Sequence, residues 1–186
     1  MKRARHNRVR CGILTRISLA ALLAIVCVVS GTLNARPRHT AKRYDSPDKR
    51  YMAIVLTENP DSMGLESSVE LRYMDGRFIG RRSYFTKSHG GGLGVVKAHW
   101  STDGKFFIFS MVGSRGNYPG KFPTFYYSSI DNRIHALDPS VGMWITDPEF
   151  SLGFDDIVIV TVHDTLPGGA VADTISRTVH LGGLKK

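Results

Sequence analysis

Residues 100–109 read Trp-Ser-Thr-Asp-Gly-Lys-Phe-Phe-Ile-Phe, and residues 46–55 read Ser-Pro-Asp-Lys-Arg-Tyr-Met-Ala-Ile-Val. The two stretches match when Ser101 is aligned with Ser46, which lies 55 residues earlier. Each places a short polar turn before a run of strand-forming residues. An internal repeat of this period indicates one supersecondary unit per copy.

A third and weaker copy covers residues 150–153, Phe-Ser-Leu-Gly, and runs into the apolar segment 157–160. It places Ser151 at the position of Ser101, a step of 50 residues. The three copies together predict that a tight turn leads the chain into an apolar strand in each unit.

The sequence past residue 44 is a succession of short β segments separated by turn residues. The predicted strands are 51–57, 68–74, 78–85, 94–100, 106–112, 124–128, 133–137, 157–162 and 175–181. Asp75-Gly76 and Asp131-Asn132 are predicted hairpin turns, and both residues of the Asp-Gly turn are expected to have positive φ. Apolar residues at helical spacing do not persist for three turns, so we expect one or two short helical turns at most. The predicted fold is all-β, an antiparallel meander of about eight to nine strands.

The segment Trp100–Ser110, and more weakly the one from Ser46, resembles the Trp-Ser-Pro-Asp-Gly-Lys opening of blades in WD-repeat-like β-propellers, as in the periplasmic propeller of the Tol-Pal system. The resemblance implies blade-like meanders of four strands. Three units are fewer than the four or more blades that close such a ring. The resemblance therefore implies blades and not a complete propeller.

The physical alternative is one antiparallel meander folded into a sandwich or an open barrel, for which the length of the body is also suitable. The apolar strands around Ile54, Ile108 and Ile159 need cover on both faces, which stacked blades provide better than two layers do. The blade-like and sandwich-like alternatives both stay open. In either, Ile54 and Ile108 are expected to lie in central, well-buried strands.

The first 43 residues hold 10 of the 25 Lys and Arg residues and no acid, whereas the chain from Asp45 onward has 15 basic and 16 acidic residues. A basic head at 1–16 before an apolar run at 17–34 is typical of a secretory signal or a signal anchor. The head cations favour a cytoplasmic N-terminus. Residues 35–44 are then expected to be an exposed tether, and 45–186 an extracytoplasmic β-domain.

An uncleaved transmembrane anchor is preferred over a cleaved signal. Cleavage after Ala35 would place Leu33 where signal peptides usually carry a smaller side chain. The expected location is the inner membrane, with the body in the periplasm or outside the cell, and secretion after cleavage is the alternative. Because the body is near neutral, binding to nucleic acid is not expected.

Both cysteines, Cys11 and Cys27, lie in the leader. The body therefore forms no disulfide and no thiolate metal site. Its histidines show no spacing typical of a metal site. They are His89, His99, His135, His163 and His180. No catalytic, cofactor-binding or metal-binding residue is assigned from the sequence, and no cofactor is expected.

Three sequence features could carry chemistry. A hydrolase could use the pair His163-Asp164, although neighbours on a strand point to opposite faces unless Asp164 already belongs to a loop. The glycine-rich stretch 88–94 could present N–H groups to an anion, but a strand follows it where a helix would be needed, so a flexible connection is preferred. Aromatic residues could line a groove for a glycan or peptide, but a role in the core is preferred for them. They are Tyr84, Phe85, Trp100, Phe122, Phe125, Tyr126 and Tyr127.

Two functional hypotheses follow. The preferred one is a membrane-tethered β-domain with a non-catalytic binding or scaffolding role in the cell envelope, whose partner is an envelope protein or glycan. The alternative is a hydrolase of envelope polymers or peptides that uses strand-borne His and Asp residues. Two histidines and a carboxylate in one cleft would favour the hydrolase.

Overall fold

The computed structural model describes residues 38–59, 65–86, 91–154, 156–165 and 171–183. Residues Pro37–Lys186 form one compact unit. The predicted head at 1–16 and anchor at 17–34 lie outside the described residues. Among the residues that are described, no helix is long and apolar enough to cross a membrane.

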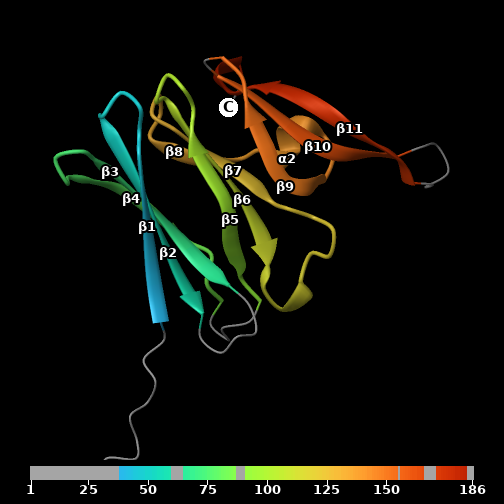
Figure 1. Ribbon diagram of the computed structural model, residues 1–186, viewed down its shortest axis with the longest axis horizontal. Coiled ribbons are helices and arrows are strands. Elements are labelled where there is room, and N and C mark those ends of the chain that lie inside the picture. Colours follow the sequence, from blue (N-terminus) through green and yellow to red (C-terminus); the bar gives the residue numbers. More distant parts are fainter. Residues whose placement is uncertain (1–37, 60–64, 87–90, 155, 166–170, 184–186) are drawn as a thin grey trace, which may run out of the picture. The chain divides into compact units, whose positions relative to one another are not determined.

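Eleven strands in this part of the chain form three antiparallel sheets, which confirms the all-β prediction. Sheet 1 contains β1 (Arg38–Asp45), β2 (Tyr51–Asn59), β3 (Glu66–Tyr73) and β4 (Phe78–Ser83). Sheet 2 contains β5 (Leu93–Trp100), β6 (Phe106–Gly113), β7 (Thr124–Ser128) and β8 (Arg133–Ala136). Sheet 3 contains β9 (Ile145–Leu152), β10 (Ile157–Thr165) and β11 (Val171–His180). Within each sheet the strands follow chain order, so each sheet is a meander (Figure 1).

Within the described residues the helical segments are short: α2 (Asp138–Val141) and two 3-10 turns, Ser114–Gly116 and Leu181–Gly183. All nine predicted strands are present, with ends that differ by a few residues. Two further strands, β1 and β9, were not predicted, so the expected number of eight to nine strands is too low.

Strand β1 corrects the prediction of an exposed tether at 35–44. It pairs with β2 along its whole length, from Arg38 opposite Asn59 to Asp45 opposite Met52. Its one large apolar side chain, Tyr44, packs against the core with its ring centroid 5.4 Å from that of Phe107. The strand is stabilised mainly by pairing, so its sequence lacks an apolar pattern.

Strand β9 has an irregular sequence because it forms an edge of sheet 3. It contains Pro148, which has no N–H to donate and is tolerated in strands mainly at edges. Ile145 and Phe150 are nevertheless buried in the core. Its pairing with β10 shifts register between Val160 and Val162.

The hairpin between β3 and β4 turns at Asp75-Gly76, as predicted. Its geometry differs from the expected one, because only Gly76 has positive φ (91°). Tyr73 N donates to Arg77 O (2.9 Å), and Gly76 N donates to Tyr73 O (2.9 Å). The connection is a three-residue turn with a glycine in the left-handed region, a common alternative to the two-residue turn.

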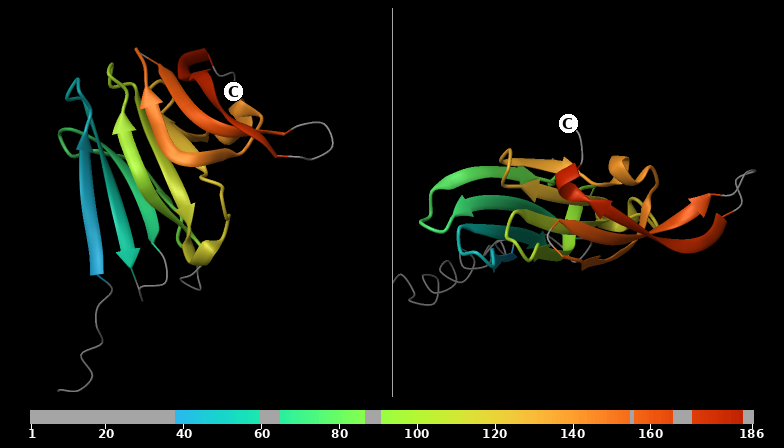
Figure 2. Two further views of the ribbon diagram at one scale, coloured as in Figure 1. Left: turned by 45° about the vertical axis from the view of Figure 1, so that its right-hand side comes forward. Right: turned by 90° about the horizontal axis from the view of Figure 1, so that it is seen from above.

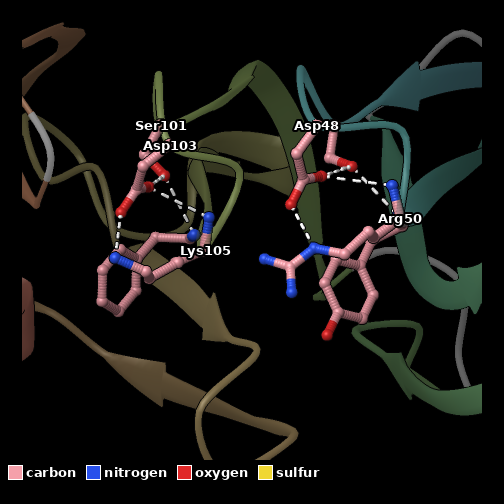
Figure 3. Close-up of polar contacts among 8 residues, drawn as sticks. Asp48, Arg50, Ser101, Asp103 and Lys105 are labelled. Carbon is pink, nitrogen blue, oxygen red and sulfur yellow. Dashed lines mark hydrogen bonds and ion pairs between the residues drawn. The ribbon is translucent and has the colours of Figure 1, made fainter.

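The turns that open β2 and β6 have the same hydrogen bonds (Figure 3). The Ser46 hydroxyl donates to Asp48 Oδ1 (2.6 Å) and accepts from Tyr51 N (3.0 Å). In the second turn the Ser101 hydroxyl donates to Asp103 Oδ1 (2.7 Å) and accepts the matching strand N–H at 3.0 Å. The alignment of Ser46 with Ser101 is therefore confirmed.

These two turns also lie against each other. Lys49 and Gly104 occupy the same position in the two turns, and both have positive φ, 57° and 72°. A Cβ atom at Gly104 would lie 2.7 Å from Asp48 Cγ of the neighbouring turn. The positive φ favours glycine at position 104 but does not require it, since Lys49 adopts a similar angle. The close approach to Asp48 is what excludes a side chain there.

The third copy of the repeat is wrong in its predicted register. Ser151 lies within β9, and Gly153 follows the end of this strand. Gly153 N donates to Ile157 O (3.0 Å), the bond that opens the following strand. The equivalent bond in the second copy comes from Ser101 N. Glycine has no hydroxyl, so this turn lacks the serine–aspartate contact of the other two.

The substitution Asp103→Asn is expected to make the free energy of unfolding depend less on pH in the acid range. Burial is the largest influence on the pKa of Asp103 and raises it, but hydrogen bonds from Lys105 and Ser101 outweigh burial, and the pKa lies below its ordinary value. Such a carboxyl stabilises the fold above its unfolded pKa, and this contribution is lost as the pH falls through the folded pKa.

Urea unfolding of wild type and variant between neutral pH and about pH 2 tests this expectation. The difference in the free energy of unfolding between wild type and Asp103→Asn should be largest near neutral pH and should decrease as the pH falls. A difference that does not change with pH would contradict the role given to this carboxylate.

The three sheets stack with sheet 2 in the middle (Figure 2). The first core cluster joins sheets 1 and 2, and the second joins sheets 2 and 3. Strand β6 contributes residues to both clusters. Phe107 and Phe109 belong to the first cluster, and Phe106 and Ile108, on the opposite face of the strand, belong to the second. Sheet 2 is therefore covered on both faces.

Ile54 and Ile108 both lie in inner strands of their sheets, as expected, but the expected burial is confirmed for Ile108 only. Ile108 is 0% exposed in the middle sheet, whereas Ile54 is only half-buried. Ile159 of sheet 3 is 36% exposed. Sheets 1 and 3 each have one face outside the two clusters, and Ile54 and Ile159 lie on those outer faces. The predicted hairpin partners of β2 and β6, which are β3 and β7, are confirmed.

Candidate functional site

A groove of about 1040 Å³ lies where sheets 2 and 3 meet. Residues from the segments 119–123 and 138–146 form most of its wall, and Phe125, Ala136 and His163 complete it. We call it the Trp144 groove. Large, mainly apolar hollows with a few polar groups are where proteins most often bind ligands.

The helix α2 gives the groove one of its walls. The helix begins at Asp138-Pro139, where proline suits the first turn, and ends at Gly142, whose φ is 73°. The carboxylate of Asp138 accepts hydrogen bonds from Thr124 N (3.1 Å) and Ile145 N (3.5 Å). These bonds connect the start of α2 to β7 and to β9. Burial raises the pKa of Asp138 above its ordinary value, against the effect of these bonds.

Trp144 projects into solvent from this wall and is 53% exposed. The ammonium group of Lys121 lies 4.1 Å from the centroid of its ring, within the range of a cation–π contact. This contact joins the segments 119–123 and 138–146, which are also linked by the bond from Phe122 N to Ile145 O (2.8 Å). The exposed ring of Trp144 is continuous with the apolar lining of the groove, and a contiguous exposed apolar surface of this kind is typical of a binding site.

Of the predicted pair His163-Asp164, the structure describes the side chain of His163 only. His163 lines the groove, whereas Asp164 lies within β10 and not in a loop, where the pairing with β11 changes register between His163 and Thr165. The carboxylate that shares the groove with His163 is Asp138. The described lining thus holds one histidine and one carboxylate, whereas two histidines and a carboxylate would favour a hydrolase.

The other described histidines lie apart from each other. His99 is on β5, His135 on β8 contacts Asp131 (3.0 Å), and His180 on β11 lies 3.6 Å from Asp156. His89 lies outside the described residues. Across the described ranges, no three His, Cys, Asp or Glu residues are close enough to hold a metal ion.

The described part of the glycine-rich stretch 88–94 is held by hydrogen bonds to side chains of the protein itself. Glu66 is 1% exposed, and its carboxylate accepts bonds from Gly92 N (2.9 Å) and from the N and Oγ1 atoms of Thr86 (both 3.1 Å). Gly91 N donates to Thr86 Oγ1 (3.1 Å). The N–H groups of Gly91 and Gly92 are thus directed at the protein's own side chains and not at a ligand. Residues 87–90 lie outside the described part of the chain.

Most of the predicted aromatic residues are in the core. Trp100, Phe125, Tyr126 and Tyr127 are buried, so the preferred interpretation is confirmed for them. The exposed aromatic residue of the groove, Trp144, was not among them. Its signal in the sequence was its place between a turn glycine and a strand, outside any alternating pattern.

A scan against protein-family models finds no match for this chain, and a search of the curated proteins finds no similar sequence.

Proposed function

We propose that this chain is a membrane-tethered extracytoplasmic β-domain that binds an extended segment of an envelope protein in the Trp144 groove, without catalysis. The observation that carries the proposal is the exposed Trp144 in a groove of about 1040 Å³. The basic head and the apolar run of the leader support the location in the envelope.

The chemistry of the groove favours a peptide over a glycan. Its wall contains three Pro and two Gly residues together with Phe125, Met143 and Trp144. Of its polar groups, Asp138 already accepts two backbone N–H groups and Lys121 lies over Trp144. A glycan needs many hydrogen bonds to its hydroxyl groups, whereas apolar side chains of a peptide bind mainly by filling such a space.

The edges of two sheets support an extended conformation for this peptide. β8 and β9 are edge strands of sheets 2 and 3, and both contribute to the groove, through Ala136 and Thr146. An extended segment can add to an edge strand through its backbone while alternate side chains enter a pocket.

For the fold, we propose the blade-like alternative. Three stacked meanders support it, because a sandwich has two layers. The matching turns at Ser46 and Ser101 support equivalent units.

Replacing Trp144 with Ala is expected to weaken peptide binding at least about tenfold, because central aromatic residues carry much of the energy of such interfaces. Peptides are first selected on the full chain, held in a non-ionic detergent, from a displayed library of short random sequences. Their affinities for wild type and variant are then measured by calorimetry. Phe154→Ala is the matched control, since Phe154 is 88% exposed and lies outside the groove.

Equal losses in the Trp144 and Phe154 variants would contradict the proposed site, and so would tight binding of oligosaccharides with none of peptides. Mass spectrometry of the selected peptides after incubation gives a further test. Cleavage that disappears in His163→Ala would favour the hydrolase over the binding domain.

A further inference from the structure

A second hollow, of about 310 Å³, lies between β4 at the edge of sheet 1 and β8 at the edge of sheet 2. Leu71 and Tyr127, each 1% exposed, form part of its lining. Its outer part carries three exposed arginines, Arg81, Arg82 and Arg133. We call it the arginine cleft. It shares no residue with the Trp144 groove.

The charges of the arginine cleft are not balanced by acids. None of its lining residues is acidic, and within the described part of the chain none of its three arginines forms an ion pair with an acid. Arg81 donates to the Ser68 hydroxyl (3.1 Å), and the guanidinium of Arg82 lies over the rings of Tyr84 (5.4 Å) and Phe125 (5.3 Å).

Four other arginines of sheet 1 and its turns differ in this respect. Each forms an ion pair with an acid two residues away in the chain: Arg43 with Asp45, Arg50 with Asp48, Arg72 with Glu70 and Arg77 with Asp75. Three cations without such partners around one small hollow produce a positive potential that attracts an anion.

The lining also offers a neutral donor next to an apolar surface. The Tyr127 hydroxyl donates to Asn132 Oδ1 (2.8 Å), which orients the amide and leaves its nitrogen for another partner. Burial raises the pKa of Tyr127, so the phenol keeps its proton and this bond. An anionic group and an apolar body can therefore both be accommodated in the same hollow.

Gly80 keeps the arginine cleft open. A Cβ atom at this position would meet nothing within 4 Å, and its φ angle is not in the left-handed region. A larger residue at position 80 would extend into the space between the two strands without straining the backbone.

We infer that the arginine cleft binds an organic anion, in which a phosphate or carboxylate group joined to a compact apolar body is held by Arg82 and Arg133. Guanidinium groups bind such anions through two parallel hydrogen bonds, and the apolar body packs against Ile79 and Ile134, the half-buried apolar residues of the lining. The inference goes beyond the proposed function, and neither depends on the other.

The test uses the full chain in a non-ionic detergent and phenyl phosphate as the probe, observed by saturation-transfer NMR and calorimetry. Saturable binding is expected, and Arg82→Gln, Arg133→Gln and Gly80→Leu should each weaken it about tenfold or more. Arg177→Gln is the matched control, because this exposed arginine of β11 lies outside the cleft. Melting temperatures of the variants show that each still folds.

Two additional ligands decide the chemistry. If dihexanoyl phosphatidic acid displaces phenyl phosphate, the source of the anion is a lipid head group, and if it does not, the source is a free small molecule. Inorganic phosphate that binds as tightly as phenyl phosphate would overturn the apolar part of the inference. Absence of saturable binding, or an equal loss in Arg177→Gln, would overturn the site.

Discussion

Replacing Ile108 with Ala is expected to lower the free energy of unfolding by about 2–5 kcal/mol, the range for a fully buried aliphatic side chain. Ile108 is 0% exposed on β6 and belongs to the cluster between sheets 2 and 3. Because it is enclosed from both sheets, its removal leaves a cavity that the surroundings fill only in part. Urea unfolding measures the loss.

Ile54→Ala is the matched control, since it removes the same atoms from the corresponding strand of sheet 1. Its side chain is half-buried on the outer face, so a loss of about 1 kcal/mol is expected. Similar losses at the two positions would mean that sheet 1 is covered on both faces in solution. The stack would then continue into another layer, formed by a second molecule or by a part of the chain outside the described residues.

Gly92→Ala is expected to cost about 2–4 kcal/mol, from overpacking together with the loss of a buried hydrogen bond. A Cβ atom at Gly92 would lie 2.2 Å from Tyr84 O and 2.8 Å from Glu66 Cδ. The backbone would have to move away from the Glu66 carboxylate, and the bond from Gly92 N would be lost. Urea unfolding, with hydrogen exchange of the Gly92 amide as a local probe, measures both effects.

Gly91→Ala is the control for this substitution. A Cβ atom there would have its nearest neighbour, Asn117 Nδ2, at 3.5 Å, which is ordinary contact. The expected change is within about 0.5 kcal/mol. A comparable loss in both variants would show that glycine is needed in this stretch for flexibility, and that the close approach to Glu66 is not the reason.

The strands that could be predicted from the sequence have alternating or continuous apolar residues, which reflect burial. β1 and β9 are edge strands without that pattern, whereas other edge strands, such as β4 and β8, carry enough of it to be predicted. An edge strand is held largely by backbone hydrogen bonds to one neighbour, and these depend little on side-chain type. The turn at Gly153 was misaligned for a related reason, since its backbone bond does not need the hydroxyl that marks the other two turns.

The burial of equivalent residues could not be predicted because it depends on the order of the sheets in the stack. Ile54 and Ile108 occur in similar sequences, and only the position of sheet 2 between the others separates them. The Trp144 groove was missed because its wall comes from turns and a short helix without periodicity. The cluster around Glu66 depends on contacts across 20 to 26 residues, which local patterns do not encode.

The two core clusters share no residue, and sheet 2 alone contributes to both. Residues 137–183 can therefore separate from the remainder while the cluster between sheets 1 and 2 remains packed. A molecule built in this way has two cooperative units in series, and its partially unfolded states follow the order of the stack. A partner bound at the junction of sheets 2 and 3 would hold sheet 3 against sheet 2. Binding of that partner would therefore prolong the lifetime of the folded chain.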